Sequence, residues 1–248
     1  GTNDAVVDYT SGSGSSTLTF NYTVQSGHNT SDLDYASTSA LVLNGGTIND
    51  AAGNATTLTL AAPGAANSLG ANKSLVIDTT VPTVASVTAN KTDGIYNVDD
   101  VIPITVTFSE AILVTGFPQL TLETGTTDAA VNYTSGSSTN TLSFFYTVSA
   151  GHNSSDLDYA STSALALNSG TIKDAAGNAA TLTLAAPGAT NSLGANKAIV
   201  IDTQSPTVAS VTSTSNDGTY KIGDVIPITV TFSEAVNIVG GPQITLET

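Results

Sequence analysis

Residues 101–108 read VIPITVTF. Its apolar side chains recur at every second position, with threonines between most of them: Ile102, Ile104, Val106 and Phe108. Side chains of a strand point alternately to opposite faces, so this pattern predicts a β-strand that is buried on one face. We expect Pro103 to mark an edge or bulged position, because proline cannot donate a hydrogen bond to a sheet.

The neighbouring stretches predict further strands. Leu120 and Leu122 alternate with threonine, and residues 142–148 alternate in the same way. A turn-rich connector between Tyr133 and Leu142 predicts a hairpin. Residues 179–184 and 198–201 add later strands. Residues 156–167 favour a turn or a single helical turn, and no stretch predicts a helix of ten or more residues.

Seven or more short strands in about 120 residues predict an all-β fold, a Greek-key β-sandwich of immunoglobulin type. The sequence has no Cys and no Trp. It therefore lacks the disulfide and tryptophan core of antibody domains.

The sequence VIPITVTF occurs a second time, unchanged, at residues 225–232. Shifting the whole chain by 124 positions aligns Gly1 with Gly125 and Thr124 with Thr248 without a gap, and 90 of the 124 aligned positions are identical. Self-similarity at a fixed period is the signature of a repeat architecture. The sequence thus predicts tandem immunoglobulin-like sandwiches with a 124-residue repeat.

The boundaries between repeats follow from the motif VIDT–x–x–P, which reads VIDTTVP at residues 76–82 and VIDTQSP at residues 200–206. A Pro-marked link is typical of a domain boundary. We therefore interpret residues 82–203 as a complete repeat, residues 1–79 as the C-terminal part of one repeat, and residues 206–248 as the N-terminal part of the next. The absence of Met leads us to expect an internal piece of a longer protein.

The composition restricts the classes of partner that this chain can bind. The net charge is −15, from 20 acidic residues against 5 basic ones. Such a chain repels nucleic acid phosphates and anionic lipids, and it contains no apolar run long enough for membrane insertion. Clustered carboxylates attract hard cations such as Ca²⁺. The alternative is that the acids only keep a long surface soluble.

Five segments together carry a family likeness: GTYKIGDVIPITVTFSEAV (218–236), GGPQITLET (240–248), NYTSGSSTNTLSFFYTV (132–148), LNSGTIKDAAGNAATLTL (167–184) and VIDTQSPTV (200–208). The chain resembles the bacterial Ig-like, cadherin-like tandem repeats of giant surface proteins and adhesins. The resemblance implies extracellular extender modules that project an adhesive domain from the cell, often with Ca²⁺ near the junctions. Related repeats often carry an acidic residue where this chain has His28 and His152, which puts a cation at that position in doubt.

Asp78 and Asp202 stand in the two links. A carboxylate there could ligate a cation that bridges consecutive domains and stiffens the hinge. The alternative is that each aspartate caps a turn before the proline. Glu110 and its counterpart Glu234 end the VIPITVTF strand, where they could reach a junction or meet only water.

Two further pairs of oxygen ligands are candidates. The sequence DAAGN occupies residues 50–54 and 174–178, so that Asp50 with Asn54, and Asp174 with Asn178, could serve a hard cation or form a plain Asx turn. Asp156 and Asp158 lie on one face of an extended chain and would repel each other unless a cation sat between them. Their alternative role is to discourage sheet aggregation.

No catalytic constellation is present. One histidine per repeat, in a polar loop that we expect to be solvated, gives no evidence of a catalytic triad. The sequence therefore predicts a protein that is not an enzyme.

Three functions remain open. The first is a structural stalk of an exported surface adhesin or fibre, stiffened by calcium, whose partners are neighbouring repeats. The second is a subunit of an extracellular filament, in which residues 204–248 of one copy complete residues 1–79 of the next. The third is a carbohydrate- or protein-binding module that uses the copy-specific aromatics Phe117 and Phe145. The sequence does not identify a receptor.

Overall fold

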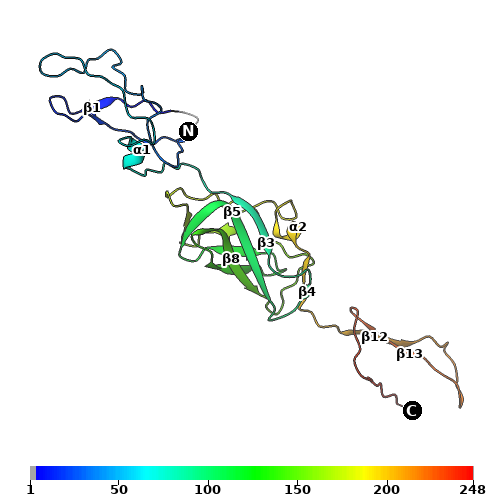
Figure 1. Cartoon of the computed structure of the whole chain (residues 1–248). Helices are drawn as coiled ribbons and strands as arrows, with labels where there is room; N and C mark the ends of the chain where they lie inside the picture. Colours follow the sequence, from blue (N-terminus) through cyan, green and yellow to red (C-terminus); the bar gives the residue numbers. More distant parts are fainter. Residues whose placement is uncertain (1–3, 248) are drawn as a thin grey trace.

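The computed structural model describes residues 4–247, which form an elongated molecule of three successive parts (Figure 1). Residues 4–79 lie at one end, residues 82–203 in the middle and residues 206–247 at the other end. The buried apolar core lies entirely between Val87 and Ile201. The middle part therefore has its own core, whereas the terminal parts expose many large apolar side chains.

The middle part is a curled antiparallel sheet with a central long strand. This strand, β5 (Val101–Thr115), pairs on one side with β3 (Val84–Ala89) and later with β10 (Thr171–Lys173), and on the other side with β8 (Thr139–Thr147). The alternation predicted for residues 101–108 is confirmed, because the four apolar side chains of one face are buried and the opposite face is more accessible.

The hairpin predicted between Tyr133 and Leu142 is also confirmed. The last residues of strand β7 (Ala129–Ser135) pair with β8, where Tyr133 lies opposite Phe144. The first residues of β7 pair with β6 (Gln119–Leu122), and β6 in turn pairs with β9 (Leu165–Ala166). Gly136 occupies the hairpin turn with a φ of 113°, and a Cβ there would collide with the carbonyl of Thr141. The sheet thus curls around the core in a sandwich-like manner.

A parallel pair closes the far end of the middle part. Strand β4 (Gly94–Tyr96) pairs with β11 (Ile199–Ile201), the last strand before the second link. The one-turn helix α2 (Leu193–Asn196) precedes β11 and packs near β3. The side chain of Ser192 caps this helix by accepting a hydrogen bond from the amide of Ala195 at 3.1 Å.

Three details differ from the sequence predictions. Pro103 lies in the central strand, not at a sheet edge: it lies opposite Phe145 of β8, and its carbonyl accepts the backbone N–H of Asn90, the residue that follows β3, at 2.8 Å. The strand does not end at Glu110 but continues to Thr115, through a bulge between Thr107 and Ile112. Residues 179–184 form only isolated bridges instead of a strand.

The terminal parts contain little regular structure. Residues 4–79 include β1 (Tyr9–Ser11), β2 (Thr19–Phe20) and the short helix α1 (Leu69–Asn72). Residues 206–247 form a single antiparallel pair, β12 (Val208–Ser213) and β13 (Ile228–Phe232). Across residues 4–247, every helix is too short to cross a membrane.

Candidate functional site

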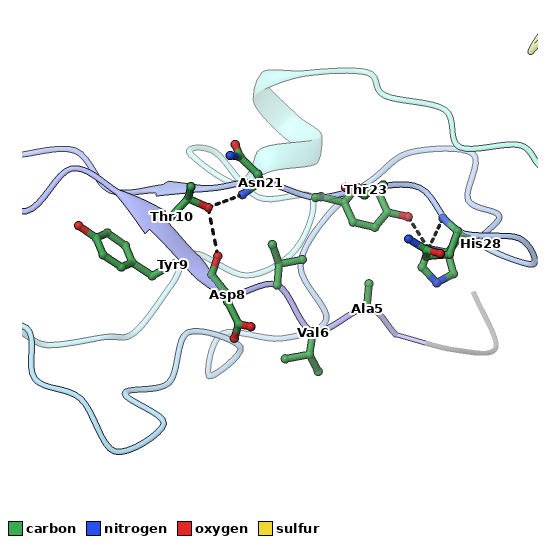
Figure 2. A pocket seen from close by; sticks show the side chains of 11 residues that line it. Ala5, Val6, Asp8, Tyr9, Thr10, Asn21, Thr23 and His28 are labelled. Carbon is green, nitrogen blue, oxygen red and sulfur yellow. Dashed lines mark hydrogen bonds between the residues drawn. The ribbon is translucent and has the colours of Figure 1, made fainter.

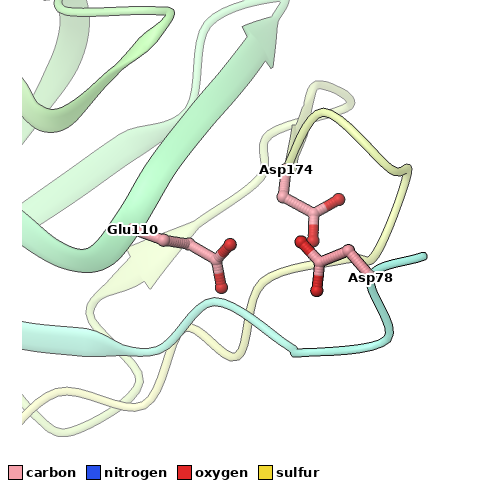
Figure 3. Close-up of side chains that lie close together, drawn as sticks. All are labelled: Asp78, Glu110 and Asp174. Atoms are coloured by element: carbon pink, nitrogen blue, oxygen red, sulfur yellow. The ribbon is translucent and has the colours of Figure 1, made fainter. Parts of the chain in front are cut away.

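Three carboxylates converge where the first link meets the middle part. Asp78, Glu110 and Asp174 each offer an oxygen, and these oxygens lie within 4.8 Å of one another (Figure 3). Asp174 is buried, and the other two are half-buried. Within residues 4–247 this is the one group of three potential metal ligands. It draws its members from three segments that are far apart in the sequence.

Each carboxylate is positioned by a different local structure. Asp78 lies in the link that leads to Pro82. Glu110 projects from the bulge of β5, where residues 108–111 oppose the single residue 140 of β8. Asp174 follows β10 directly. The bulge matters because an extra residue in one strand redirects the side chains around it, and here it turns Glu110 toward the link.

Asp174 is held by a tight turn. Its Oδ1 accepts a hydrogen bond from the backbone N–H of Asn178 at 2.8 Å, and its Oδ2 accepts one from the Asn178 side-chain amide at 2.7 Å. Gly177 supplies the left-handed conformation with a φ of 97°. Burial alone would raise the pKa of Asp174, but the bonds from Asn178 and the following turn lower it overall. Asp174 is therefore a fixed anion.

Glu110 is in the opposite situation. Burial raises its pKa, and the negative charges of Asp78 and Asp174 raise it further. Its ionised form thus carries an electrostatic cost that a proton or a cation would relieve.

The link is bonded to the middle part through its backbone. The carbonyl of Asp78 accepts a hydrogen bond from the side-chain amide of Asn178 at 3.1 Å. The Asp78 carboxylate also accepts the backbone N–H of Thr80 at 2.9 Å, which is the turn that the sequence offered as the alternative to ligation. The two roles are compatible, since the bond to Thr80 uses Oδ1 and a carboxylate has several lone pairs.

The geometry fits a hard divalent cation. Ca²⁺ binds six to eight oxygens at about 2.3–2.6 Å, so two of its ligands can lie up to about 5 Å apart. The separation of 4.8 Å among the three carboxylates falls inside that limit. Three carboxylates would hold such an ion together with carbonyl or water oxygens.

The other predicted ligands are not gathered into a group of three. Asp202 and Glu234 occupy the positions of Asp78 and Glu110 in the repeat, and neither belongs to a group of three potential ligands within residues 4–247. Asp202 makes the same turn as Asp78, by accepting the N–H of Gln204 at 3.0 Å.

The turn at residues 50–54 reproduces the one at residues 174–178. The Asn54 backbone and side chain donate to the Asp50 carboxylate, both at 2.8 Å. These hydrogen bonds lower the pKa of Asp50. The DAAGN sequence therefore builds an Asx turn in both places, and only Asp174 has other carboxylates beside it among the described residues.

The carboxylates of Asp156 and Asp158 lie beside the same glycine but differ in burial: a Cβ at Gly194 would lie 3.4 Å from Asp156 Oδ2 and 3.0 Å from Asp158 Oδ2. Asp158 is buried and accepts the backbone N–H groups of Tyr159 and Gly188, both at 2.9 Å, whereas Asp156 is exposed. The Asp158 carboxylate thus has a structural role in joining two loops.

The expectation that the histidines are solvated loop residues is wrong. His152 is half-buried, stacks on Tyr146 with ring centres 5.9 Å apart, and forms a hydrogen bond between its Nδ1 and the Tyr146 hydroxyl at 2.9 Å. Burial raises the pKa of Tyr146 to about 12, so the hydroxyl stays protonated and can donate. The backbone carbonyl of His152 also accepts the Thr203 hydroxyl at 3.0 Å, which ties this loop to the second link. In the sequence, the only indication of this contact is that Tyr and His are six residues apart in both repeats.

Comparisons with protein-family models, with curated proteins and with solved structures give no match for this chain.

Proposed function

We propose that this chain is a stalk segment of a large exported surface adhesin or fibre. In this proposal it consists of immunoglobulin-like Greek-key repeats of 124 residues, and Ca²⁺ stiffens their junctions. The observation that carries the proposal is the convergence of Asp78, from the link, with Glu110 and Asp174, from the body of the following repeat.

A cation bound at this place would act on the hinge. The link at Asp78 is a single extended segment between the first and the middle part (Figure 1), and the hydrogen bond from Asn178 to the Asp78 carbonyl fixes it at one point. Coordination by all three carboxylates adds bonds that exist only when the link lies against the body. A ligand present at 100 times its Kd stabilises the conformation that binds it by about 2.7 kcal/mol.

The remaining features support a role in spacing. The parts succeed one another along an elongated molecule, and the sequence repeats with 90 of 124 positions identical. The aromatic side chains of Phe117 and Phe145 are exposed, but they come from different elements. Phe117 lies in a loop, and Phe145 lies on the outward face of β8. The proposal therefore makes the neighbouring repeats the main partners and the extracellular space the location.

Small-angle scattering of the 248-residue chain in calcium and in excess EDTA tests the proposal. We expect a longer maximum dimension and a higher Tm in calcium. Asp174→Asn should lose both effects, whereas Asp50→Asn, the same change in the equivalent turn, should keep them. An equally extended and equally stable chain in EDTA would refute the calcium-stiffened junction.

A further inference from the structure

We infer that Asn29 is a positioning residue of the candidate cation site, and that through it the first part of the molecule sets the affinity of this site. The inference rests on the proposed function, because it concerns the same three carboxylates. Asn29 is not one of them. It acts on Asp78 through the peptide unit between Asp78 and Thr79.

This peptide unit is held from two sides. Its N–H, which belongs to Thr79, donates to Oδ1 of Asn29 at 2.7 Å. Its carbonyl, which belongs to Asp78, accepts the side-chain amide of Asn178 at 3.1 Å. Asn29 lies in the first part of the molecule and Asn178 in the middle part. Because a peptide unit is planar and, in its trans form, directs its N–H and carbonyl oppositely, the two asparagines hold opposite edges of one rigid plane.

The first part also holds the chain on both sides of Asp78. Before it, Ile77 and Thr30 exchange two backbone hydrogen bonds, at 2.8 and 2.9 Å. After it, the Thr79 hydroxyl accepts the backbone N–H of Gly27 at 3.0 Å. Asp78 is therefore flanked by residues that the first part fixes. Its carboxylate is presented by the first part to the two carboxylates of the middle part.

The loop that carries Asn29 is shaped by the neighbouring histidine. Nδ1 of His28 accepts the backbone N–H of Gln25 at 3.3 Å and forms a hydrogen bond with the Tyr22 hydroxyl at 2.7 Å (Figure 2). The rings of Tyr22 and His28 stack with their centres 5.8 Å apart. These contacts give the loop a defined shape, so that Asn29 meets the link in one place.

The same arrangement recurs at the second link, away from the three carboxylates. Oδ1 of Asn153 accepts the N–H of Thr203 at 3.1 Å, and the Thr203 hydroxyl accepts the N–H of Gly151 at 3.0 Å. Within residues 4–247, the group of three potential ligands does not include Asp202, the residue before Thr203. Asn29 and Asn153 thus make the same bond, but only Asn29 acts on a ligand of the candidate site.

Loss of this bond should lower the affinity for a cation. Without Asn29 the plane is held only at its carbonyl edge and can tilt, which moves the carboxylate of Asp78 away from its two partners. Removal of a residue that orients a metal ligand typically weakens metal binding by about 10–100-fold. The coupling is reciprocal, so a bound cation should also stabilise the loop of the first part that holds the link.

Calorimetric titration of the 248-residue chain with calcium tests the inference. Asn29→Ala should raise the Kd at least about tenfold, and Asn153→Ala should leave it unchanged. Binding that is lost in Asp174→Asn, but is weakened equally or not at all by the two alanine substitutions, would overturn the inference and leave the proposed function in place. Calcium binding that did not depend on Asp174 would refute the proposed function, and the inference with it.

A double-mutant cycle separates positioning from a general loss of structure. In the Asp78→Ala background the ligand that Asn29 orients is gone, so adding Asn29→Ala should not change the weaker binding that remains. The same fold-change in both backgrounds would show that Asn29 acts elsewhere, against the inference.

Hydrogen exchange measures the reciprocal effect. Calcium should slow exchange of the Gly27 and Thr30 amides in the wild type and not in Asp174→Asn, because both amides bond to the link. Exchange at these amides that ignored calcium, in a chain that binds it through Asp174, would contradict the coupling.

Discussion

The side-chain amide of Asn178 donates a hydrogen bond to the backbone carbonyl of Asp78, a residue 100 positions earlier, at 3.1 Å. The same nitrogen donates to the carboxylate of Asp174 at 2.7 Å. One amide thus fixes the link and orients a candidate cation ligand. This arrangement couples the position of the link to the turn that follows β10.

Replacing Asn178 with alanine should therefore weaken the junction. The substitution removes both side-chain bonds and leaves the Asp78 carbonyl and the Asp174 carboxylate short of partners, which costs about 1–3 kcal/mol for buried groups. We expect a lower Tm of the main unfolding transition and faster hydrogen exchange at the link. Asn54→Ala is the matched control, because Asn54 makes the same bonds within its own turn, in a part of the chain without the buried core. Equal effects of the two substitutions on the main transition would argue against a special role of Asn178.

Glu110→Gln should have opposite effects with and without calcium. In EDTA it removes a charge that burial and the neighbouring aspartates make unfavourable, so the free energy of unfolding at pH 7 should rise by up to about 1 kcal/mol. In calcium it removes a ligand, so the metal-dependent increase in Tm should disappear. Calorimetry in both buffers measures the two effects. If Glu110→Gln destabilised the EDTA form, the three carboxylates would not be in electrostatic conflict.

The dependence on pH follows from the same residue. The pKa of Glu110 is raised in the folded state, so the folded state binds this proton more readily than the unfolded state. Its contribution to stability is fully present below about pH 4.5, the ordinary value, and is lost as the pH rises through the raised pKa. In EDTA, the stability difference between Glu110→Gln and the wild type should therefore shrink on acidification from pH 7. Urea titrations at several pH values measure it, and a difference that stays constant would contradict the assigned shift.

The contribution of Asp174 to stability should change with pH in the opposite direction to that of Glu110. Its pKa is lowered in the folded state, so its contribution to stability is present above the ordinary value of about 3.8 and disappears as the pH falls through the lowered pKa. The stability lost in Asp174→Asn should be largest near neutrality and smallest below about pH 3. The same urea titrations report this difference, with Asp50→Asn as the variant that should leave the main transition in place.

The sequence predicted the β-structure where alternation was strong. Residues 101–108 and 142–148 have the expected buried faces because the period of two leaves no alternative for their apolar side chains. The hairpin between Tyr133 and Leu142 was equally predictable, since its turn residues are local signals. The position of the candidate site was predictable in part: Asp78, Glu110 and Asp174 were each singled out, but as members of separate motifs.

The convergence of these residues could not be predicted because it depends on tertiary structure. Asp78 and Asp174 are 96 positions apart, and Glu110 joins them from the bulge in β5, which no local pattern in residues 108–111 reveals. The histidines were misjudged for a related reason. The sequence around His152 is polar and loop-like, but the contact that buries its ring comes from Tyr146 on the neighbouring strand.

The two equivalent phenylalanines should differ in their energetic importance. Phe144→Ala deletes a fully buried ring and should cost about 3–5 kcal/mol of unfolding free energy. Phe20→Ala changes a residue that is 39% exposed and lies outside the core, so the main transition of a dilute sample should hardly move. Chemical denaturation of both variants at low concentration makes the comparison. Similar losses would mean that the N-terminal part shares one cooperative core with the middle part.

The parallel pairing of β4 with β11 has a mechanical consequence. Gly94 donates to the carbonyl of Ala198 at 3.1 Å, and Asp202 donates to the carbonyl of Tyr96 at 3.0 Å, so these bonds bracket the pair from one end to the other. The chain leaves the middle part directly from β11. When it is pulled along its length, that strand is drawn past β4 and the bonds are loaded together, in shear, instead of opening one after another. Resistance to tension is thus concentrated in the three residue pairs of β4 and β11 beside the second link, and a pulling experiment should break these pairs before it disrupts the apolar core.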